Sequence, residues 1–205
     1  MKIFLEHTSK RFLRHWIFKD INYTFSAPGA YALLGANGSG KSTLLRIIAG
    51  MQNPSLGKVS HFDKDQLVES NALFPYISFC APGIEIVEEF TLREFLAFHF
   101  SFKKMLPGLS ISTIIELCRL QDAADRVIGE FSSGMKQRVK LAQAIFADTP
   151  VLLLDEPCTN LDQAGVEQYT DWMAQYAKDR LVIVASNDVR EYFFCKERLT
   201  VEEYK

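Results

Sequence analysis

The sequence predicts an α/β fold in which parallel strands and helices alternate around a buried sheet. One observation is the glycine-rich stretch Gly35–Thr43, which lies between a short apolar run and a helical run. Another is the apolar run Val151–Leu154, which ends in two acidic residues, because buried parallel strands carry ligand-binding groups at their carboxyl ends. A helix at 164–177 and a strand at 181–185 continue the alternation, and residues 198–203 could add a final strand.

Two strands are expected before the glycine-rich stretch, at residues 2–8 and 17–26. The second alternates apolar and polar side chains, as a half-buried strand does. Residues 10–16 form an aromatic and basic connection between them. Within that connection, Phe12 is a better candidate than Trp16 for stacking on an adenine ring. Ordinary packing of the aromatic ring is an alternative of equal weight.

The middle of the chain changes from strands to helices. Strands are predicted at 58–62 and 76–80, and residues 91–147 read as mostly helical. Thr91 and Glu94 have the spacing of a capping box at the start of the first of these helices. This segment is rich in phenylalanine, for which core packing and an exposed docking surface are both open.

Size and composition restrict the class of protein. A chain of 205 residues, 48% of them hydrophobic, suits one domain with a substantial core. A formal net charge of -2 does not favour a broad nucleic-acid interface. The 4 cysteines are scattered, which predicts reduced thiols rather than a disulfide or zinc framework. The sequence contains no long uncharged apolar run, so no membrane span is predicted.

The glycine-rich stretch matches the complete G-x-x-x-x-G-K-[ST] motif that binds phosphates. Its glycines let the backbone bend so that amide groups approach a phosphate chain, and a helix that begins beneath them adds its positive dipole end. Lys41 supplies a charge for the β- and γ-phosphates, the Ser42 hydroxyl can ligate Mg²⁺, and Thr43 can reach the α-phosphate. The candidate nucleotide-binding residues are therefore Phe12, Gly35, Asn37, Gly38, Ser39, Gly40, Lys41, Ser42 and Thr43.

The acidic pair after the apolar run predicts the second half of this site. Asp155 can hold Mg²⁺ through water, opposite Ser42, so these two are the candidate metal ligands. Glu156 can orient and polarise the attacking water as a general base. A helix cap or a solvated loop is the structural alternative for two adjacent acids.

Further motifs narrow the class of nucleotide-binding protein. The run Phe131–Arg138 resembles the Leu-Ser-Gly-Gly-Gln signature of ATP-binding cassette (ABC) ATPases. The runs Asp155–Pro157 and Thr159–Asp162 resemble the Walker B and D-loop sequences of the same family. The resemblance covers nearly the whole chain, and the motifs occur in the order and spacing of the family. It implies a P-loop NTPase core of mainly parallel sheet, an antiparallel β subdomain and a helical subdomain at about 83–147, within one nucleotide-binding domain spanning 1–205.

The resemblance also implies how such a chain works. It looks like the ATP-binding and hydrolysing subunit of an ABC transporter, with ATP and Mg²⁺ as ligands. Two such subunits, identical or different, would pair head to tail and move a transmembrane permease subunit from the inner face of the cell membrane. By this resemblance Ser132 and the amide of Gly134 would contact the partner's ATP, Ser133 would belong to the same signature, and Asp162 would lie at the dimer seam. No nucleic-acid partner is expected.

Three departures from the family pattern bear on activity. The signature carries Phe131, Ser133 and Met135 where the family has Leu, Gly and Gln. No Gln follows the strand near residue 79, where nucleotide state is passed to the membrane partner. The switch His is replaced by Asn187, which cannot become cationic near neutral pH. These departures predict slow hydrolysis, and the presence of Glu156 predicts that the site is not inactive. Glu156 and Asn187 are therefore the candidate catalytic residues.

Two other functions stay open at this point. One is a degenerate or regulatory ABC subunit with weak hydrolysis, which the missing Gln and Asn187 favour. The other is a soluble ABC ATPase that does not transport, although such proteins usually carry tandem cassettes or long insertions. Steady-state ATPase activity separates the regulatory subunit from a working motor, and co-purification with a multi-spanning protein separates transport from other roles.

Overall fold

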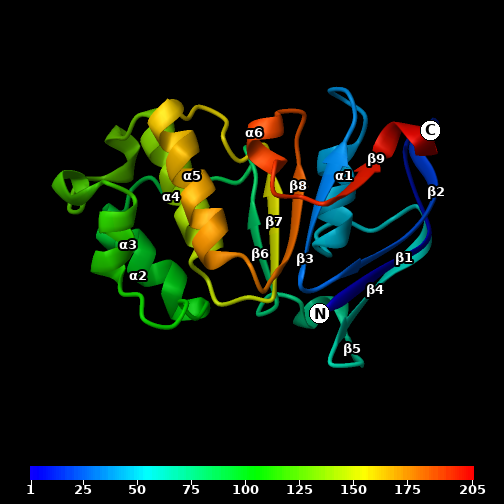
Figure 1. Cartoon of the computed structure of the whole chain (residues 1–205), viewed down its shortest axis with the longest axis horizontal. Coiled ribbons are helices and arrows are strands. Elements are labelled where there is room, and N and C mark those ends of the chain that lie inside the picture. The colour runs from blue at the N-terminus through cyan, green and yellow to red at the C-terminus, as the bar shows by residue number, and fades with distance from the viewer.

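A computed structural model describes residues 1–205 and contains two sheets with one helix between them (Figure 1). The strands are β1 (Lys2–Phe12), β2 (His15–Ser26), β3 (Gly29–Leu34), β4 (Leu56–Asp63), β5 (Gln66–Val68), β6 (Ile77–Cys80), β7 (Val151–Asp155), β8 (Leu181–Ala185) and β9 (Glu197–Thr200). The α-helices are α1 (Lys41–Ile48), α2 (Leu92–Phe102), α3 (Ile111–Leu117), α4 (Ser133–Ile145), α5 (Gln163–Tyr176) and α6 (Val189–Tyr192). Short 3₁₀ turns are η1 (Ser70–Ala72), η2 (Gln121–Ala123), η3 (Ile128–Glu130) and η4 (Val201–Tyr204).

The central sheet has the order β6-β7-β8-β3-β9, and every neighbouring pair in it is parallel. The central strands β7 and β8 are buried at every position because both faces of the sheet are covered, whereas the edge strand β9 begins with exposed charged residues. Leu153 and Ile183 pack in the core around α1, whereas Leu152 and Val184 pack in the core with α4 and α5. This arrangement confirms the predicted α/β fold.

The N-terminal strands form a separate antiparallel sheet of order β2-β1-β4-β5. Its inner face presents Ile3 and Phe25 to Leu44 and Ile48 of α1, all of which are fully buried. Helix α1 is therefore enclosed between the two sheets. This contact fixes the residues that precede α1, which are those of the glycine-rich motif.

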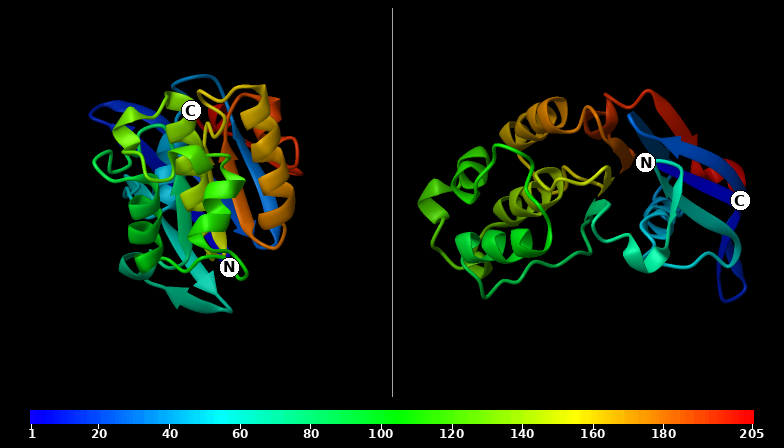
Figure 2. Two further views of the ribbon diagram at one scale, coloured as in Figure 1. Left: turned by 90° about the vertical axis from the view of Figure 1, so that its left-hand side faces the viewer. Right: turned by 90° about the horizontal axis from the view of Figure 1, so that it is seen from below.

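Helices α2, α3 and α4 lie at the end of the molecule opposite the antiparallel sheet, as the two views of Figure 2 show. Thr91 caps α2, and the reciprocal bonds with Glu94 confirm the predicted capping box. On the outer side of α2, Phe98 and Phe102 are 48% and 64% exposed, and their ring centroids are 5.1 Å apart. The phenylalanine-rich segment thus supplies both buried and exposed rings.

Several predicted boundaries differ from the structure, most of all in the segment 10–16. That segment is not a connection, because β1 and β2 pair as far as Phe12 opposite His15 and only a two-residue turn separates them. The short strand β5 was not predicted. The last strand ends at Thr200, and the chain continues as the turn η4 rather than as a strand to 203.

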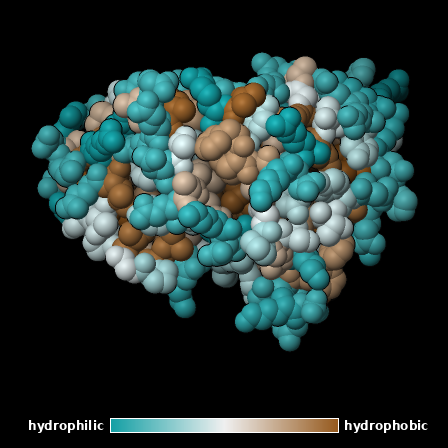
Figure 3. All heavy atoms as spheres, in the orientation of Figure 1, coloured by the Kyte–Doolittle hydropathy of each residue, from teal (hydrophilic) through white to brown (hydrophobic).

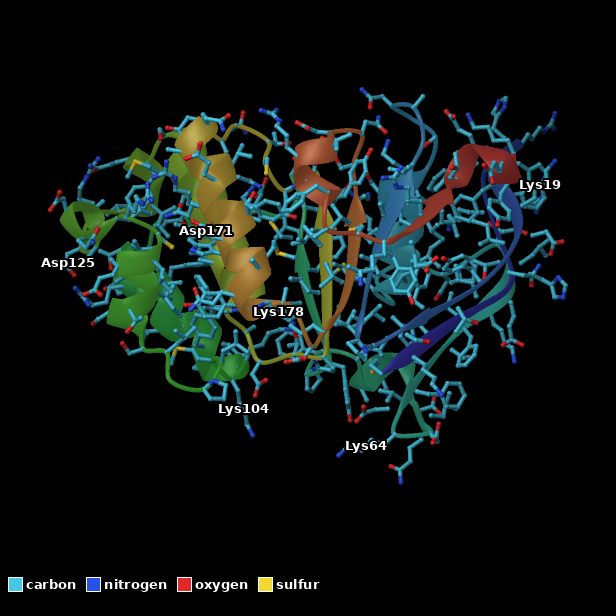
Figure 4. All side chains as sticks on the ribbon, in the orientation of Figure 1. Lys19, Lys64, Lys104, Asp125, Asp171 and Lys178 are labelled. Atoms are coloured by element: carbon cyan, nitrogen blue, oxygen red, sulfur yellow. The ribbon has the colours of Figure 1, made fainter.

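A hollow of about 490 Å³ lies at the amino ends of β3 and β8, far along the strands from the glycine-rich motif. Figure 3 shows apolar side chains gathered on this face between α5 and α6. Met173, Phe193 and Phe194 line the hollow, and Lys178 borders it at the end of α5 (Figure 4).

All 4 cysteines are buried and free. None of the helices has the length and apolar character needed to traverse a bilayer.

Candidate functional site

The glycine-rich loop joins β3 to α1 and contains three glycines with positive φ, two of which are also closely packed. Gly35 and Gly40 have φ of 141° and 106°, in the region that favours glycine. A Cβ at Gly40 would collide with Cγ2 of Ile17, and one at Gly35 would lie 2.6 Å from Oγ of Ser39. The loop therefore packs closely against β2 and against itself. Helix α1 begins without a side-chain cap, so the N–H groups of its first turn lack partners within the helix.

Lys41, the first residue of α1, is 5% exposed and turns its ammonium group into the loop. Its Nζ donates to the carbonyl of Gly35 at 2.6 Å and to that of Ala36 at 3.3 Å. Next to it is a cavity of about 200 Å³ lined by Ile17, Asn37, Gly38, Gly40, Lys41, Ser42, Thr43 and Glu156. A helix N-terminus and a buried cation at one cavity make an environment that favours an anion.

Ser42 links this loop to the end of β7, because its hydroxyl donates to Oδ1 of Asp155 at 3.0 Å. Asp155 is 3% exposed, and burial raises its pKa, opposed by this hydrogen bond and by nearby cations that include Lys41. Two adjacent oxygen groups suit Mg²⁺, which takes one or two protein ligands and completes its shell with phosphate and water. No cluster of three or more His, Cys, Asp or Glu side chains offers a fuller protein cage.

Glu156 and Asn187 border one cavity beside the glycine-rich loop. Glu156 follows β7 with φ of 45°, its N–H donates to the carbonyl of Ala185, and its side chain is exposed. The Asn187 amide donates to Oδ1 of Asn37 at 3.2 Å. All three polar side chains border a second cavity of about 320 Å³, so the structure brings the two candidate catalytic residues to the glycine-rich loop.

The signature residues lie at the start of α4, apart from both of these cavities. Ser132 caps the helix by accepting from the N–H of Met135, and Ser132 and Ser133 are exposed. At Gly134 a Cβ would lie 3.0 Å from the carbonyl of Asn160, so the glycine permits close packing of the next loop. The hydroxyl of Ser133 occupies open surface, so within this chain it disturbs no contact.

Asp162 has partners within its own chain. Its Oδ1 accepts from the N–H of Gly165 at 2.8 Å, which caps α5, and from Nη2 of Arg138 at 3.1 Å. The hydrogen bond from Gly165 is the main cause of a lowered pKa of Asp162. The carboxylate thus ties the start of α5 to α4.

Phe12 stands at the end of β1 and is 48% exposed, with the Lys10 ammonium 5.3 Å from its ring centroid. It does not line the cavity at the loop, whereas Ile17 does. Because Phe12 pairs with His15, its side chain shares a face of the hairpin with His15 and Ile17. The strand periodicity of 17–26 gave no reason to select Ile17 as a site residue.

Two carboxylates that were not singled out also contact loops of the site. Oε1 of Glu191 accepts from the N–H of Cys158 at 2.6 Å, and burial raises the pKa of Glu191. Oε1 of Glu202 accepts from the N–H of Ala36 in the glycine-rich loop at 2.8 Å. Neither belongs to a local motif, so their spacing in the sequence carries no signal for these contacts.

The stretch that lacks the family's Gln lies beside a third cavity, of about 370 Å³. Phe79 lines it together with Phe74, His99 and Lys103. The Lys103 ammonium donates to the carbonyls of Phe74 and Ile77, and burial lowers its pKa to about 8. Burial, assisted by the charge of Lys103, lowers the pKa of His99 to about 4. This cavity is therefore largely apolar, with a cation at its edge.

Solved structures with the same fold include a putative ABC transporter ATP-binding protein from Pyrococcus furiosus. It has a TM-score of 0.81 at 20% sequence identity, and the match covers 100% of both chains. A dimeric ATP-binding cassette, MJ0796, with ADP and Pi bound has a TM-score of 0.80 at 20% identity, covering 97% of this chain and 93% of that one. At these identities the likeness establishes the fold.

Relatives in sequence are ATP-binding proteins of import and export systems. One is a sulfate/thiosulfate import ATP-binding protein, CysA, of Thermosynechococcus vestitus, 33% identical over 183 residues, which are 87% of this chain and 54% of that protein. Another is Nod factor export ATP-binding protein I of Rhizobium johnstonii, 33% identical over 161 residues, which are 77% of this chain and 52% of that protein. The chain spans about half the length of these curated relatives. A family model described as ABC transporter matches residues 18–159, and the chain accordingly belongs to the ABC transporter family.

Proposed function

We propose that this chain binds ATP with Mg²⁺ and hydrolyses it as the nucleotide-binding subunit of an ABC transporter. The observation that carries the proposal is the joined site, in which Ser42 of the glycine-rich loop bonds Asp155 at the end of β7. Membership of the family, and relatives named as ATP-binding proteins of import and export systems, support the same function.

Each candidate residue then has a physical role. Amides at the start of α1 and the Lys41 ammonium hold the phosphates, and Thr43 lies beside them at the same cavity. Ser42 and Asp155 would hold Mg²⁺, whose charge would offset that of the phosphate oxygens. Glu156, at the mouth of the cavity, accepts a proton from the attacking water, and Asn187 donates a hydrogen bond to the γ-phosphate.

A second subunit completes the site. Ser132 and Ser133 are exposed at the N-terminus of α4 and border neither cavity of their own chain, so their donors are available to another chain's nucleotide. Two subunits therefore pair head to tail, identical or different, with ATP between them and Asp162 near the seam. Dimeric cassettes among the structures with this fold support the arrangement.

A transmembrane permease subunit is the further partner. The cavity of about 370 Å³ has exposed apolar side chains at its edge, Met51 at 61% and Phe74 at 57% exposed, and it contains Phe79 from the stretch where the family's Gln is missing. An apolar helix end that carries a carboxylate fits this surface, because the carboxylate can approach Lys103. The chain itself then works at the inner face of the cell membrane.

Calorimetry with Mg-ATP tests the binding step. Wild-type protein takes up one nucleotide per chain, and Lys41→Ala loses the heat of binding because the loop loses its only buried cation. Lys10→Ala is a matched control, since that lysine contacts Asn53 and the Phe12 ring instead. Absence of binding by the wild-type protein, or equal binding by Lys41→Ala, refutes the proposal.

A regulatory subunit with weak hydrolysis is the second candidate, favoured by the Asn187 contact with Asn37. In that case ATP still binds and still drives dimer formation, but turnover is close to zero. Steady-state phosphate release, measured on protein that binds ATP by calorimetry, separates the two functions.

A further inference from the structure

The C-terminal turn of the chain reaches the glycine-rich loop through one carboxylate. Strand β9 runs parallel to β3, with Thr200 opposite Leu34, so the residues after both strands emerge at the same end of the sheet (Figure 1). Val201 is fully buried and anchors η4 there. The next residue, Glu202, accepts from the N–H of Ala36 at 2.8 Å, across 166 positions of sequence.

The contact falls on the part of the loop that holds Lys41. The carbonyl of Ala36 accepts from Nζ of Lys41 and, at 3.0 Å, from the N–H of Ser39. Cγ of Glu202 lies 3.4 Å from where a Cβ of Gly35 would be, so the side chain rests against the loop. Residue 36 is therefore held on one side by the C-terminal turn and on the other by the loop's own hydrogen bonds.

We propose that Glu202 is a positioning residue for nucleotide binding, acting through the Ala36 amide. It orients the first turn of the loop so that the Lys41 ammonium and the amides at the start of α1 converge on the phosphates. It lines neither cavity of the site, so it acts without touching the nucleotide. This inference rests on the proposed ATP binding, but the hydrogen bond itself can be tested without nucleotide.

Three variants isolate the contact. Glu202→Ala removes the acceptor, Glu202→Gln keeps an oxygen acceptor without the charge, and Glu203→Ala is the matched control. Glu203 is an exposed carboxylate in the same turn with no hydrogen bond or ion pair. Full-length protein is used throughout.

The first measurement is amide hydrogen exchange at Ala36 by NMR, without nucleotide. Loss of one hydrogen bond in Glu202→Ala speeds exchange there by roughly three- to tenfold. Glu202→Gln keeps most of the protection, and Glu203→Ala exchanges like wild type. Unchanged exchange at Ala36 in Glu202→Ala overturns the inference, whatever happens to nucleotide affinity.

The second measurement is the dissociation constant for Mg-ATP by calorimetry. Glu202→Ala weakens binding by roughly three- to tenfold, Glu202→Gln restores it, and Glu203→Ala has no effect. Faster exchange with unchanged affinity overturns the positioning role, as does equal weakening by Glu203→Ala. A wild-type protein with a protected Ala36 amide and no uptake of ATP refutes the proposed function while leaving the contact itself intact.

Discussion

Replacing Asn187 by His tests the proposed role of the switch position most sharply. Asn187 is exposed, lies at the same cavity as Glu156 and contacts only Asn37 through its side chain, so an imidazole fits without repacking the core. An Asn amide can donate a hydrogen bond to a γ-phosphate, but this donor carries no charge of its own. A protonated His donates a charge-assisted hydrogen bond, which stabilises developing negative charge more strongly.

The size of the effect follows from the two kinds of hydrogen bond. A neutral hydrogen bond contributes about 1 kcal/mol and one to a charged group about 1.5–3 kcal/mol. Taken as the scale of the gain from a charged donor, the difference of about 0.5–2 kcal/mol corresponds to a rise in turnover of about two- to thirtyfold. Because an ordinary His titrates near pH 6.5, the gain should be larger at pH 6 than at pH 8.

The assay is steady-state phosphate release at saturating Mg-ATP, for wild type, Asn187→His and Asn187→Ala. We expect slow turnover in the wild type, a gain with His that grows as the pH falls, and a further loss with Ala. The KM changes little, because Lys41 and the loop amides are intact in every variant. A wild-type rate that is already fast and is unchanged by His refutes this explanation of the switch position.

Three further predictions concern stability and the loop. The pKa of His99 is about 4 in the folded protein against 6.5 in the unfolded chain, so the wild type should lose about 3 kcal/mol of stability from this group as the pH falls from 6.5 to 4. His99→Gln keeps a donor for the carbonyl of Gln143 but does not titrate, so urea denaturation of this variant should lack that loss. Glu191→Gln keeps an acceptor for Cys158; because the folded pKa of Glu191 is raised above 4.5, the wild type should lose stability as pH rises through that folded pKa, and the variant should not. Gly40→Ala should destabilise the protein by about 1–3 kcal/mol in the same assay and weaken Mg-ATP binding, because φ is 106° and the Cβ meets Ile17. A pH profile that matches the wild type in either of the first two variants, or wild-type stability in the third, contradicts the corresponding argument.

Local patterns predicted the elements whose signals are contained in a short stretch of sequence. The buried strands β7 and β8 follow from uninterrupted apolar runs, and the cap of α2 follows from Thr91 and Glu94. The joined site was also within reach, because a loop before a helix and an acid after a buried strand meet at the same edge of a parallel sheet. The Ser42 contact with Asp155 matches that expectation.

Tertiary packing decided what the sequence pattern missed. At α3 the competing signal was itself local: Thr113 and Glu116 have the spacing of a capping box, but α3 begins at Ile111 and is capped by Ser110, whose Oγ accepts from the N–H of Thr113. The aromatic segment 10–16 extends a hairpin because residues 10–12 of β1 pair with β2 as far as Phe12 opposite His15. Glu202 reaches the loop only because β9 lies beside β3, which no local window of sequence records.

The central claim, a nucleotide enclosed between two subunits, is tested most directly with Glu156→Gln. This variant should bind Mg-ATP normally and fail to hydrolyse it, so light scattering after size-exclusion chromatography should find a dimer with Mg-ATP and a monomer without it. Glu156→Gln combined with Lys41→Ala should stay monomeric in both. A single variant that binds ATP by calorimetry yet keeps the mass of one chain contradicts a composite site made of two copies of this chain.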